Sequence, residues 1–414
     1  MNQPRNLPSR LIGTDNPVAQ RLVETRAMRG FADGLVAVAL ASYLSHIGFS
    51  AGQIGWITTA TLVGSAAATI TLGMLAGGWE HRRLLIMASV LMVLTGIGFL
   101  TIRDFWVMIP VAFIGTMNPS SGDVSVFLPL EQTEIAGSVA SDRRTAIFAR
   151  FSLYANLAAA GGSFAAGAIA AYVAAQHFDP IRTGQIGFAI YAAVGLIIFW
   201  RYQGLPRSDP ADRASKPRVG LHKSRGVVIR MAALFSLDSL GGGFVVQTML
   251  ILWLNQRYGM SEAQAGLLFT ITSLLAAFSM LAAAPVASKI GLVNTMVFTH
   301  LPAQIFLMAT PFMPTLELAM VCLMARALLA SMDVPARTAF VMAAVEPEER
   351  PAASSVTNVP RSLASAISPA IAGQLLTVTA FGWPLIIGGA MKASYDLILL
   401  AWFRKIDLVE PETR

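Results

Sequence analysis

The sequence predicts an all-α membrane protein, with twelve transmembrane helices in two pseudo-symmetric six-helix bundles. The clearest observation behind this prediction is an internal repeat. The octapeptide GFSAGQIG at Gly48 to Gly55 returns as GMSEAQAG at Gly259 to Gly266, roughly half a chain later, and each copy follows one apolar run and opens the next. A repeat at half the chain length inside a hydrophobic sequence is typical of two similar membrane bundles fused in tandem.

Composition is the second observation. Hydrophobic residues make up 55% of the 414 residues and charged residues 13%, and the mean hydropathy is +0.61. Soluble domains carry roughly 25% charged residues. Several uncharged runs reach the length of about 20 helical residues that a ~30 Å hydrocarbon core requires. The expected spans are 27–46, 52–78, 83–102, 105–130, 145–174, 184–203, 227–255, 262–287, 291–313, 317–343, 355–379 and 383–403.

The third observation is one polar linker, 205–226, which is rich in arginine, lysine and proline. It divides the chain into an N-terminal bundle, 1–204, and a C-terminal bundle, 227–414. Basic residues concentrate in the linker, in the N-terminal segment and in alternate loops, which predicts that both termini and the linker are cytoplasmic. The seven tryptophans all fall near expected span ends, as an aromatic belt at the membrane interface requires.

Several function classes become improbable on the same evidence. The net charge of +7 reflects loops beside membrane spans, so we expect no nucleic-acid partner. The only cysteine, Cys322, allows no intramolecular disulfide. Residues 1–22 lack the apolar core of a signal peptide, so the first span is expected to serve as the insertion signal. The five histidines show no metal-ligand spacing, and there is neither a nucleophile motif nor a phosphate-binding loop. We therefore expect no enzyme activity, cofactor or metal.

The stretch from Arg326 to Gly373 carries a family resemblance. It contains the segments RALLASMDVPAR, EPEERPAASSVTNVPR and SPAIAG in this order. Arg144 and Gly167 mark a degenerate copy in the first half. Together with the 6+6 repeat and the basic linker, this pattern resembles bacterial members of the major facilitator superfamily over essentially the whole chain. The resemblance implies a secondary transporter in the inner membrane that rocks two bundles about a central site and works as a monomer.

Other motifs of that family are degraded here. The loop after the second span usually reads GxLADRxGRR, and Gly77 stands where the aspartate belongs, although Arg82 and Arg83 fit. The second copy has Ser288 at that position and keeps Lys289. The fifth span lacks the proline of the antiporter motif, so the motif does not support antiport. The resemblance implies gating roles for the following basic residues: Arg82, Arg83, Arg144, Lys289 and Arg350.

Charges inside the expected spans are the most informative chemical pattern. A charge near the bilayer centre costs at least about 2.5–3.5 kcal/mol on insertion scales. The resemblance implies that the first, fourth, seventh and tenth helices line the central cavity, and each has one mid-span aspartate. Together with two arginines they form the predicted proton- or substrate-binding set: Asp33, Asp123, Asp238, Asp333, Arg29 and Arg326.

Two interpretations of these acids stay open. Burial favours the neutral form of a carboxyl, so an acid exposed alternately to the two sides could carry protons. Alternatively, spacings of four residues predict fixed ion pairs, Arg29 with Asp33 and Asp333 with Arg337. The same spacing predicts a structural pair of Lys392 and Asp396. Asp123 and Asp238 have no basic residue at helical spacing in their own spans, which favours proton or cation binding.

Three further residues or motifs complete the sequence-based predictions. Glu131 is expected near the cytoplasmic boundary, solvated or paired with a loop. His300 is expected to be a satisfied core histidine. The triple glycine that follows Asp238 (Gly241 to Gly243), like the Asn–Pro before Asp123, permits either a flexible binding region or close helix packing.

The function that these features favour is export of a small organic solute in exchange for protons. Membrane lipids are the other expected partners. Proton-coupled uptake and an uncoupled facilitator are the first alternatives. A polytopic enzyme or scaffold without transport activity is the alternative of another class, which solute flux in vesicles would separate.

Overall fold

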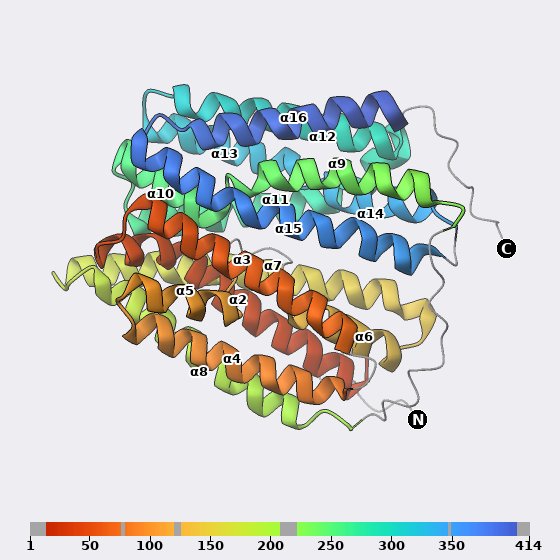
Figure 1. The fold of residues 1–414 in the computed structure, drawn as a ribbon, viewed down its shortest axis with the longest axis horizontal. Helices are drawn as coiled ribbons and strands as arrows, with labels where there is room; N and C mark the ends of the chain where they lie inside the picture. The colour runs from red at the N-terminus through yellow and green to blue at the C-terminus, as the bar shows by residue number, and fades with distance from the viewer. Residues whose placement is uncertain (1–13, 76–78, 120–125, 208–221, 347–348, 404–414) are drawn as a thin grey trace. The chain divides into compact units, whose positions relative to one another are not determined.

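The computed structural model describes the chain except for 1–13, 76–78, 120–125, 208–221, 347–348 and 404–414. In the described part every regular element is helical (Figure 1), because backbone groups in hydrocarbon must find hydrogen bonds within their own segment. In the first half the helices are α2 (Pro17–His46), α3 (Ala51–Leu75), α4 (His81–Thr101), α5 (Phe105–Ile114), α6 (Phe127–Ser138), α7 (Ser141–Ala175) and α8 (Ile181–Gln203). In the second half they are α9 (Arg225–Gly243), α10 (Gln247–Tyr258), α11 (Glu262–Ile290), α12 (Leu292–Ala309), η2 (Thr310–Phe312), α13 (Leu316–Ala330), α14 (Asp333–Ala343), α15 (Arg350–Val378) and α16 (Trp383–Phe403).

In the described part of the chain, each of the twelve predicted spans contains helix. Within the described ranges, ten helical segments are long and apolar enough to cross a membrane. The two remaining spans, the fourth and the eleventh, are occupied by α5 with α6 and by the 29-residue helix α15. The fold class is therefore the predicted all-α membrane architecture of twelve transmembrane helices.

Three of the four spans with a mid-span aspartate are built from two helices each. The seventh span breaks between α9 and α10, and the tenth between α13 and α14, with Asp333 as the first residue of α14. In the fourth span α5 ends at Ile114 and α6 begins at Phe127, and Asp123 lies outside the described residues. The first span, α2, is continuous over its 30 residues. Two of the described acids, Asp238 and Asp333, thus lie beside helix ends.

The chain forms two compact units. Unit 1 comprises Met1–Gly48, Gly64–Ser215 and Glu262–Thr270, and unit 2 comprises Phe49–Val63, Lys216–Ser261 and Ile271–Arg414. The predicted domain limits fall in the linker, most of which lies outside the described residues, so they stay a prediction.

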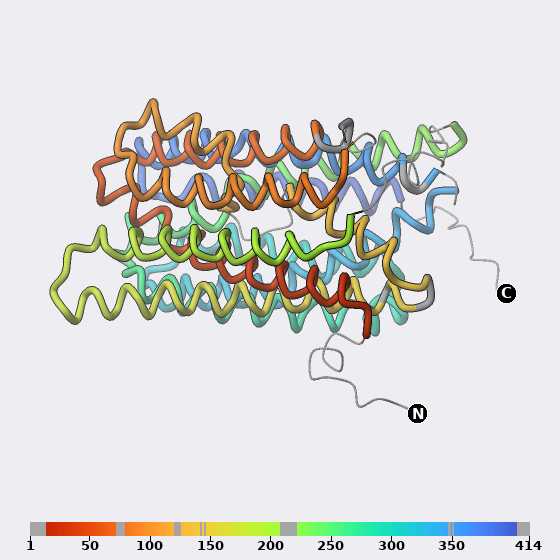
Figure 2. The backbone as a smooth tube through the Cα atoms, turned by 90° about the horizontal axis from the view of Figure 1, so that it is seen from below, coloured from red at the N-terminus to blue at the C-terminus, as the bar shows by residue number. Residues whose placement is uncertain are grey.

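Within each unit the corresponding helices pack together. In unit 1, α2 packs against α7 and α8, and α4 packs against α8. In unit 2, α9 packs against α15 and α16, and α12 packs against α16. Figure 2 shows α2 in red alongside α7 in yellow. The first, fifth and sixth spans thus repeat their packing in the seventh, eleventh and twelfth, which is the structural counterpart of the sequence repeat.

Glycines allow the closest of these contacts. A Cβ atom on Gly241 would lie 2.7 Å from the carbonyl oxygen of Gly388 in α16, and one on Gly243 would clash with the carbonyl oxygen of Ser365 in α15. A Cβ atom on Gly34 of α2 would clash in the same way with Ala159 of α7. The triple glycine therefore serves close helix packing, as small residues do in membrane bundles.

Candidate functional site

Unit 1 contains a buried ion pair between Arg29 of α2 and Glu131 of α6. Two hydrogen bonds join the guanidinium to the carboxylate, with N···O distances of 2.7 and 3.0 Å. The Tyr202 hydroxyl of α8 donates to Glu131 Oε1 at 2.6 Å, and the Arg29 guanidinium lies 4.2 Å from the centre of the Phe127 ring. The arginine is 2% exposed and the glutamate 0%. Bidentate geometry and the aromatic face suit arginine in particular.

This arrangement corrects two sequence-based predictions. Glu131 was expected near a solvated boundary, but it is fully buried. Arg29 was expected to pair with Asp33, but its guanidinium reaches Glu131 on another helix. The spacing of four residues places two side chains on one face of α2, yet a long arginine side chain can instead cross to the neighbouring helix with better geometry.

Asp33 is left without such a partner. It lies one turn after Arg29 on α2 and is 5% exposed. Its Oδ1 atom has no hydrogen-bond partner among the described residues, and its carboxylate forms no ion pair within them. A buried polar atom without a partner carries a desolvation cost, which is much larger for an anion than for a neutral acid.

Unit 2 contains a larger network centred on Asp238 of α9. Lys392 Nζ of α16 lies 2.6 Å from Asp238 Oδ1, and Arg337 Nη1 of α14 lies 3.1 Å from Asp238 Oδ2. Arg337 also pairs with Asp333 at 3.2 Å, one helical turn away. The predicted pair of Asp333 and Arg337 is therefore confirmed. Asp238, which has no basic residue at helical spacing in its own span, has a basic partner from each of two other helices.

A second pair joins the same network from α12 and α16. His300 Nδ1 lies 3.0 and 3.1 Å from the two carboxylate oxygens of Asp396, and His300 Nε2 lies 4.0 Å from Asp238 Oδ1. Asp396 is 0% exposed. The predicted pair of Lys392 and Asp396 is wrong, because each side chain contacts a different helix. His300 is satisfied, as expected, but by a carboxylate.

The remaining predicted site residues lie apart from these pairs. Arg326 of α13 is partly buried, and its Nε atom has no partner among the described residues. Of the predicted gating residues, Arg82 donates to the carbonyl of Gln203, Arg83 pairs with Glu80 at 3.0 Å, and Arg144 donates to the carbonyl of Val139. Lys289 is exposed, Arg350 begins α15, and Gly77 lies outside the described residues.

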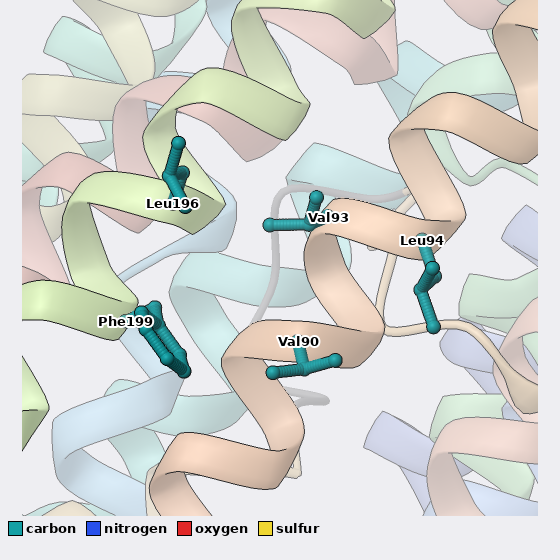
Figure 3. A pocket seen from close by; sticks show the side chains of 5 residues that line it. All are labelled: Val90, Val93, Leu94, Leu196 and Phe199. Carbon is teal, nitrogen blue, oxygen red and sulfur yellow. The ribbon is translucent and has the colours of Figure 1, made fainter.

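Other kinds of site find no support in the described ranges. They hold no group of three histidine, cysteine or acidic side chains that could bind a metal ion. One small pocket of about 150 Å³ lies between α4 and α8, where Figure 3 shows five apolar side chains around it. They are Val90, Val93, Leu94, Leu196 and Phe199. Val90, Leu94 and Leu196 are exposed, which suits a surface in contact with lipid chains. Neither charged network borders this pocket.

Sequence reasoning missed the partners that come from distant helices. Each of these side chains is visible in the sequence as a polar residue within an apolar run: Tyr202, Asp238, His300, Lys392 and Asp396. That is the only signal the sequence offers, because an ionisable residue in a membrane span needs a partner or a function. Which partner it has depends on helix rotation.

Repeated bundles with buried ionisable networks define a polytopic membrane protein of transporter type. The comparisons with known proteins agree. The family model of the Major Facilitator Superfamily matches twice, over residues 25–246 and 231–414. The chain belongs to this superfamily, and secondary transport is the function that the family supports.

Individual relatives are distant. The chain is 24% identical over 408 residues to an uncharacterized membrane protein of Saccharomyces cerevisiae, covering 90% of this chain and 91% of that protein. It is 23% identical over 193 residues to a D-xylose transporter of Levilactobacillus brevis, covering 45% and 39% of the two chains.

Solved structures show the same fold at low identity. The nucleoside transporter NupG aligns with a TM-score of 0.72 at 14% identity, covering 94% of this chain and 100% of that one. A D-xylose-proton symporter aligns with a TM-score of 0.71 at 15% identity, covering 92% and 97%.

Proposed function

We propose that this protein is a proton-coupled secondary transporter of a small organic solute, and that Asp33 is a proton-binding residue. The observation that carries the proposal is the buried carboxyl of Asp33, which forms no ion pair and has one oxygen without a hydrogen-bond partner among the described residues. It lies in a membrane helix whose neighbouring arginine is already neutralised by Glu131. An anion at this place is unfavourable, so the carboxyl is stable when it holds a proton and must lose it to a favourable environment. Alternation between two such environments is what couples a proton to a solute.

Export in exchange for protons is the direction that we propose. Uptake with protons is the second candidate. Arg29 is engaged with Glu131, and Asp238 with Lys392 and Arg337, so these charges are already neutralised without a solute. Of the predicted substrate contacts in the described part, Arg326 is the arginine that has no ion pair there. We also propose an inner-membrane location with both termini cytoplasmic, and a monomer as the transporting unit.

The test uses proteoliposomes with a pH-sensitive dye inside and an imposed solute gradient. The panel contains sugars, nucleosides, amino acids, organic cations and organic anions. The Asp33→Asn variant is compared with Asp179→Asn, a matched change at an exposed aspartate whose Oδ1 caps the backbone of Ile181, a contact that asparagine can keep.

The expected result is solute-dependent proton movement that Asp33→Asn abolishes and Asp179→Asn retains. Opposite directions of solute and proton would establish export by exchange, and a common direction would establish uptake. Solute flux with no proton movement in any variant would overturn the coupling and leave a facilitator. If no solute moved at all with correctly inserted protein, the transport proposal itself would fail for the solutes tested.

A further inference from the structure

We propose that His300 and Asp396 together form a second proton-binding site, in unit 2, and that they share one exchangeable proton. The pair is buried: His300 is 4% exposed and Asp396 0%. The His300 Nδ1 atom lies within hydrogen-bond distance of both carboxylate oxygens of Asp396. This assignment rests on the proposed function only for its role in transport, because proton binding can be measured without a solute.

The charges around the pair explain why a proton is needed there. Lys392 and Arg337 directly contact Asp238, and Arg337 also contacts Asp333. These two cations are therefore engaged, and His300 is the one basic group that contacts Asp396 among the described residues. Without an added proton the His300–Asp396 pair carries one negative charge. With one proton, on either the imidazole or the carboxyl, the pair is neutral, as burial in a low-dielectric region favours.

Other ionisable groups of the described residues approach the pair from several helices. From α9, Asp238 faces His300 Nε2 at 4.0 Å, and from α14, Asp333 and Arg337 face the network. From α16 come Lys392 and Tyr395, and the Tyr395 ring stands edge-on to the His300 ring at 6.1 Å. Arg326 of α13 forms no ion pair in the described part of the chain, and Arg361 of α15 donates to Ser239.

Two buried polar atoms show that the network is not closed. The Tyr395 hydroxyl is 0% exposed and has no hydrogen-bond partner in the described part of the chain, and the same holds for Oδ1 of Asp333. A network built only for stability would satisfy these groups, because each costs free energy when it is left unpaired. Hydrogen-bonding groups without partners suit a site whose hydrogen bonds rearrange when it gains or loses a proton.

Loss of the proton has a definite structural consequence. Lys392 and Asp396 lie one turn apart on α16, so a deprotonated Asp396 competes with Asp238 for the Lys392 ammonium. Lys392 to Asp238 is a direct ion pair between α16 and α9, at 2.6 Å. Proton release at the pair therefore weakens a contact between two packed helices, which connects proton binding to a change in helix packing.

Nitrogen-15 NMR of histidine-labelled, purified protein tests the site directly. The His300→Gln variant identifies the His300 signals, and His177→Asn, at an exposed histidine, serves as the matched control. We expect the His300 signals to change with pH as a single protonation step, and to lose that step or shift it by more than one pH unit in Asp396→Asn. Asp396→Glu should restore it. His300 signals that are insensitive to pH, or a titration unchanged by Asp396→Asn in folded protein, would overturn the proposal.

A transport experiment then asks whether this proton is coupled. One pH unit drives about tenfold accumulation for each coupled proton. Asp396→Asn should reduce accumulation to a ratio near one while solute counterflow, which needs no net proton movement, continues. Lys392→Met should retain the His300 titration but lose the accumulation. If Asp33→Asn stops proton movement and Asp396→Asn does not, this second site is uncoupled although the proposed function stands. If no variant or wild type moves protons, the proposed function fails, and the NMR titration still decides whether the site binds a proton.

Discussion

The two units repeat their helix packing but differ in how they neutralise buried charge. In unit 1, Arg29 and Glu131 form a bidentate pair, with a tyrosine hydroxyl on the carboxylate. In unit 2, Asp238 sits between Lys392 and Arg337, and Asp396 has His300 as its basic partner. The repeat thus fixes which helices meet, whereas single side chains decide whether the buried charges form one ion pair or a larger network.

The largest expected effects on stability come from removing one partner of a buried ion pair. Glu131→Gln removes the partner of Arg29 and should destabilise the protein by about 3–5 kcal/mol, the usual cost of breaking a buried ion pair from one side. The double variant Arg29→Met with Glu131→Gln removes both charges and should recover most of that loss. Thermal unfolding in detergent, followed by tryptophan fluorescence, measures both.

Asp238→Asn should be at least as damaging, because it leaves Lys392 without its partner and Arg337 with Asp333 alone. Its rescue by Lys392→Met should be incomplete, because Arg337 would still lack one of its two carboxylate partners. Equal rescue in both units would contradict the distinction between a single ion pair and a larger network. A stable Asp238→Asn protein would show that Asp238 is not held as a fixed anion.

Two buried tyrosines allow a matched comparison in which the expected changes in stability are smaller. Both are 0% exposed, but the Tyr202 hydroxyl donates to Glu131 at 2.6 Å and the Tyr395 hydroxyl has no partner in the described residues. Tyr202→Phe should therefore cost about 1.5–3 kcal/mol, as expected for a hydrogen bond to a charged group. Tyr395→Phe should leave the unfolding temperature unchanged or raise it, and a loss as large as that of Tyr202→Phe would show that the hydroxyl is satisfied.

The number of helices and their repeat in two bundles could be predicted from the sequence, whereas most charge partners could not. Apolar runs set the spans because the hydrocarbon thickness fixes their length. Asp333 with Arg337 was predictable because both lie on one helix, one turn apart. Arg29 with Glu131 and Lys392 with Asp238 join residues far apart in the sequence. Their identity depends on the rotation of α6, α9 and α16, which many small packing contacts decide together, Gly241 against Gly388 among them.

Glu349 provides a pH-dependent contact in unit 2 outside the spans. Its carboxylate accepts hydrogen bonds from the backbone N–H groups of His222, Lys223 and Ser224, at 2.7 to 2.9 Å, just before α9 begins. These bonds favour the anion and lower the pKa of Glu349 from 4.5 to about 2. A lowered folded-state pKa contributes stability above pH 4.5 that is lost as the pH falls toward 2.

Glu349→Gln should therefore lower the unfolding temperature at pH 7, and the difference from wild type should shrink as the pH falls from 5 to 3. Glu346→Gln is the matched control in the same loop. Because Glu349 lies between α14 and α15 and contacts the segment just before α9, the change tests unit 2 without touching its buried network. A difference that stays constant with pH would mean that the glutamate acts through its shape and not through its charge.

The smallest stability effect is expected at Arg83, one of the predicted gating residues. Its pair with Glu80 spans three residues, and the arginine side chain is 72% exposed. Exposed ion pairs contribute only about 0–1 kcal/mol, because water and salt screen them and ordering the side chains costs entropy. Arg83→Gln should leave the unfolding temperature within experimental error of wild type. Any loss of transport rate in that variant would then report a contact made in another conformation, as gating requires. An unchanged rate would remove Arg83 from the gating set and leave it a solvated loop residue.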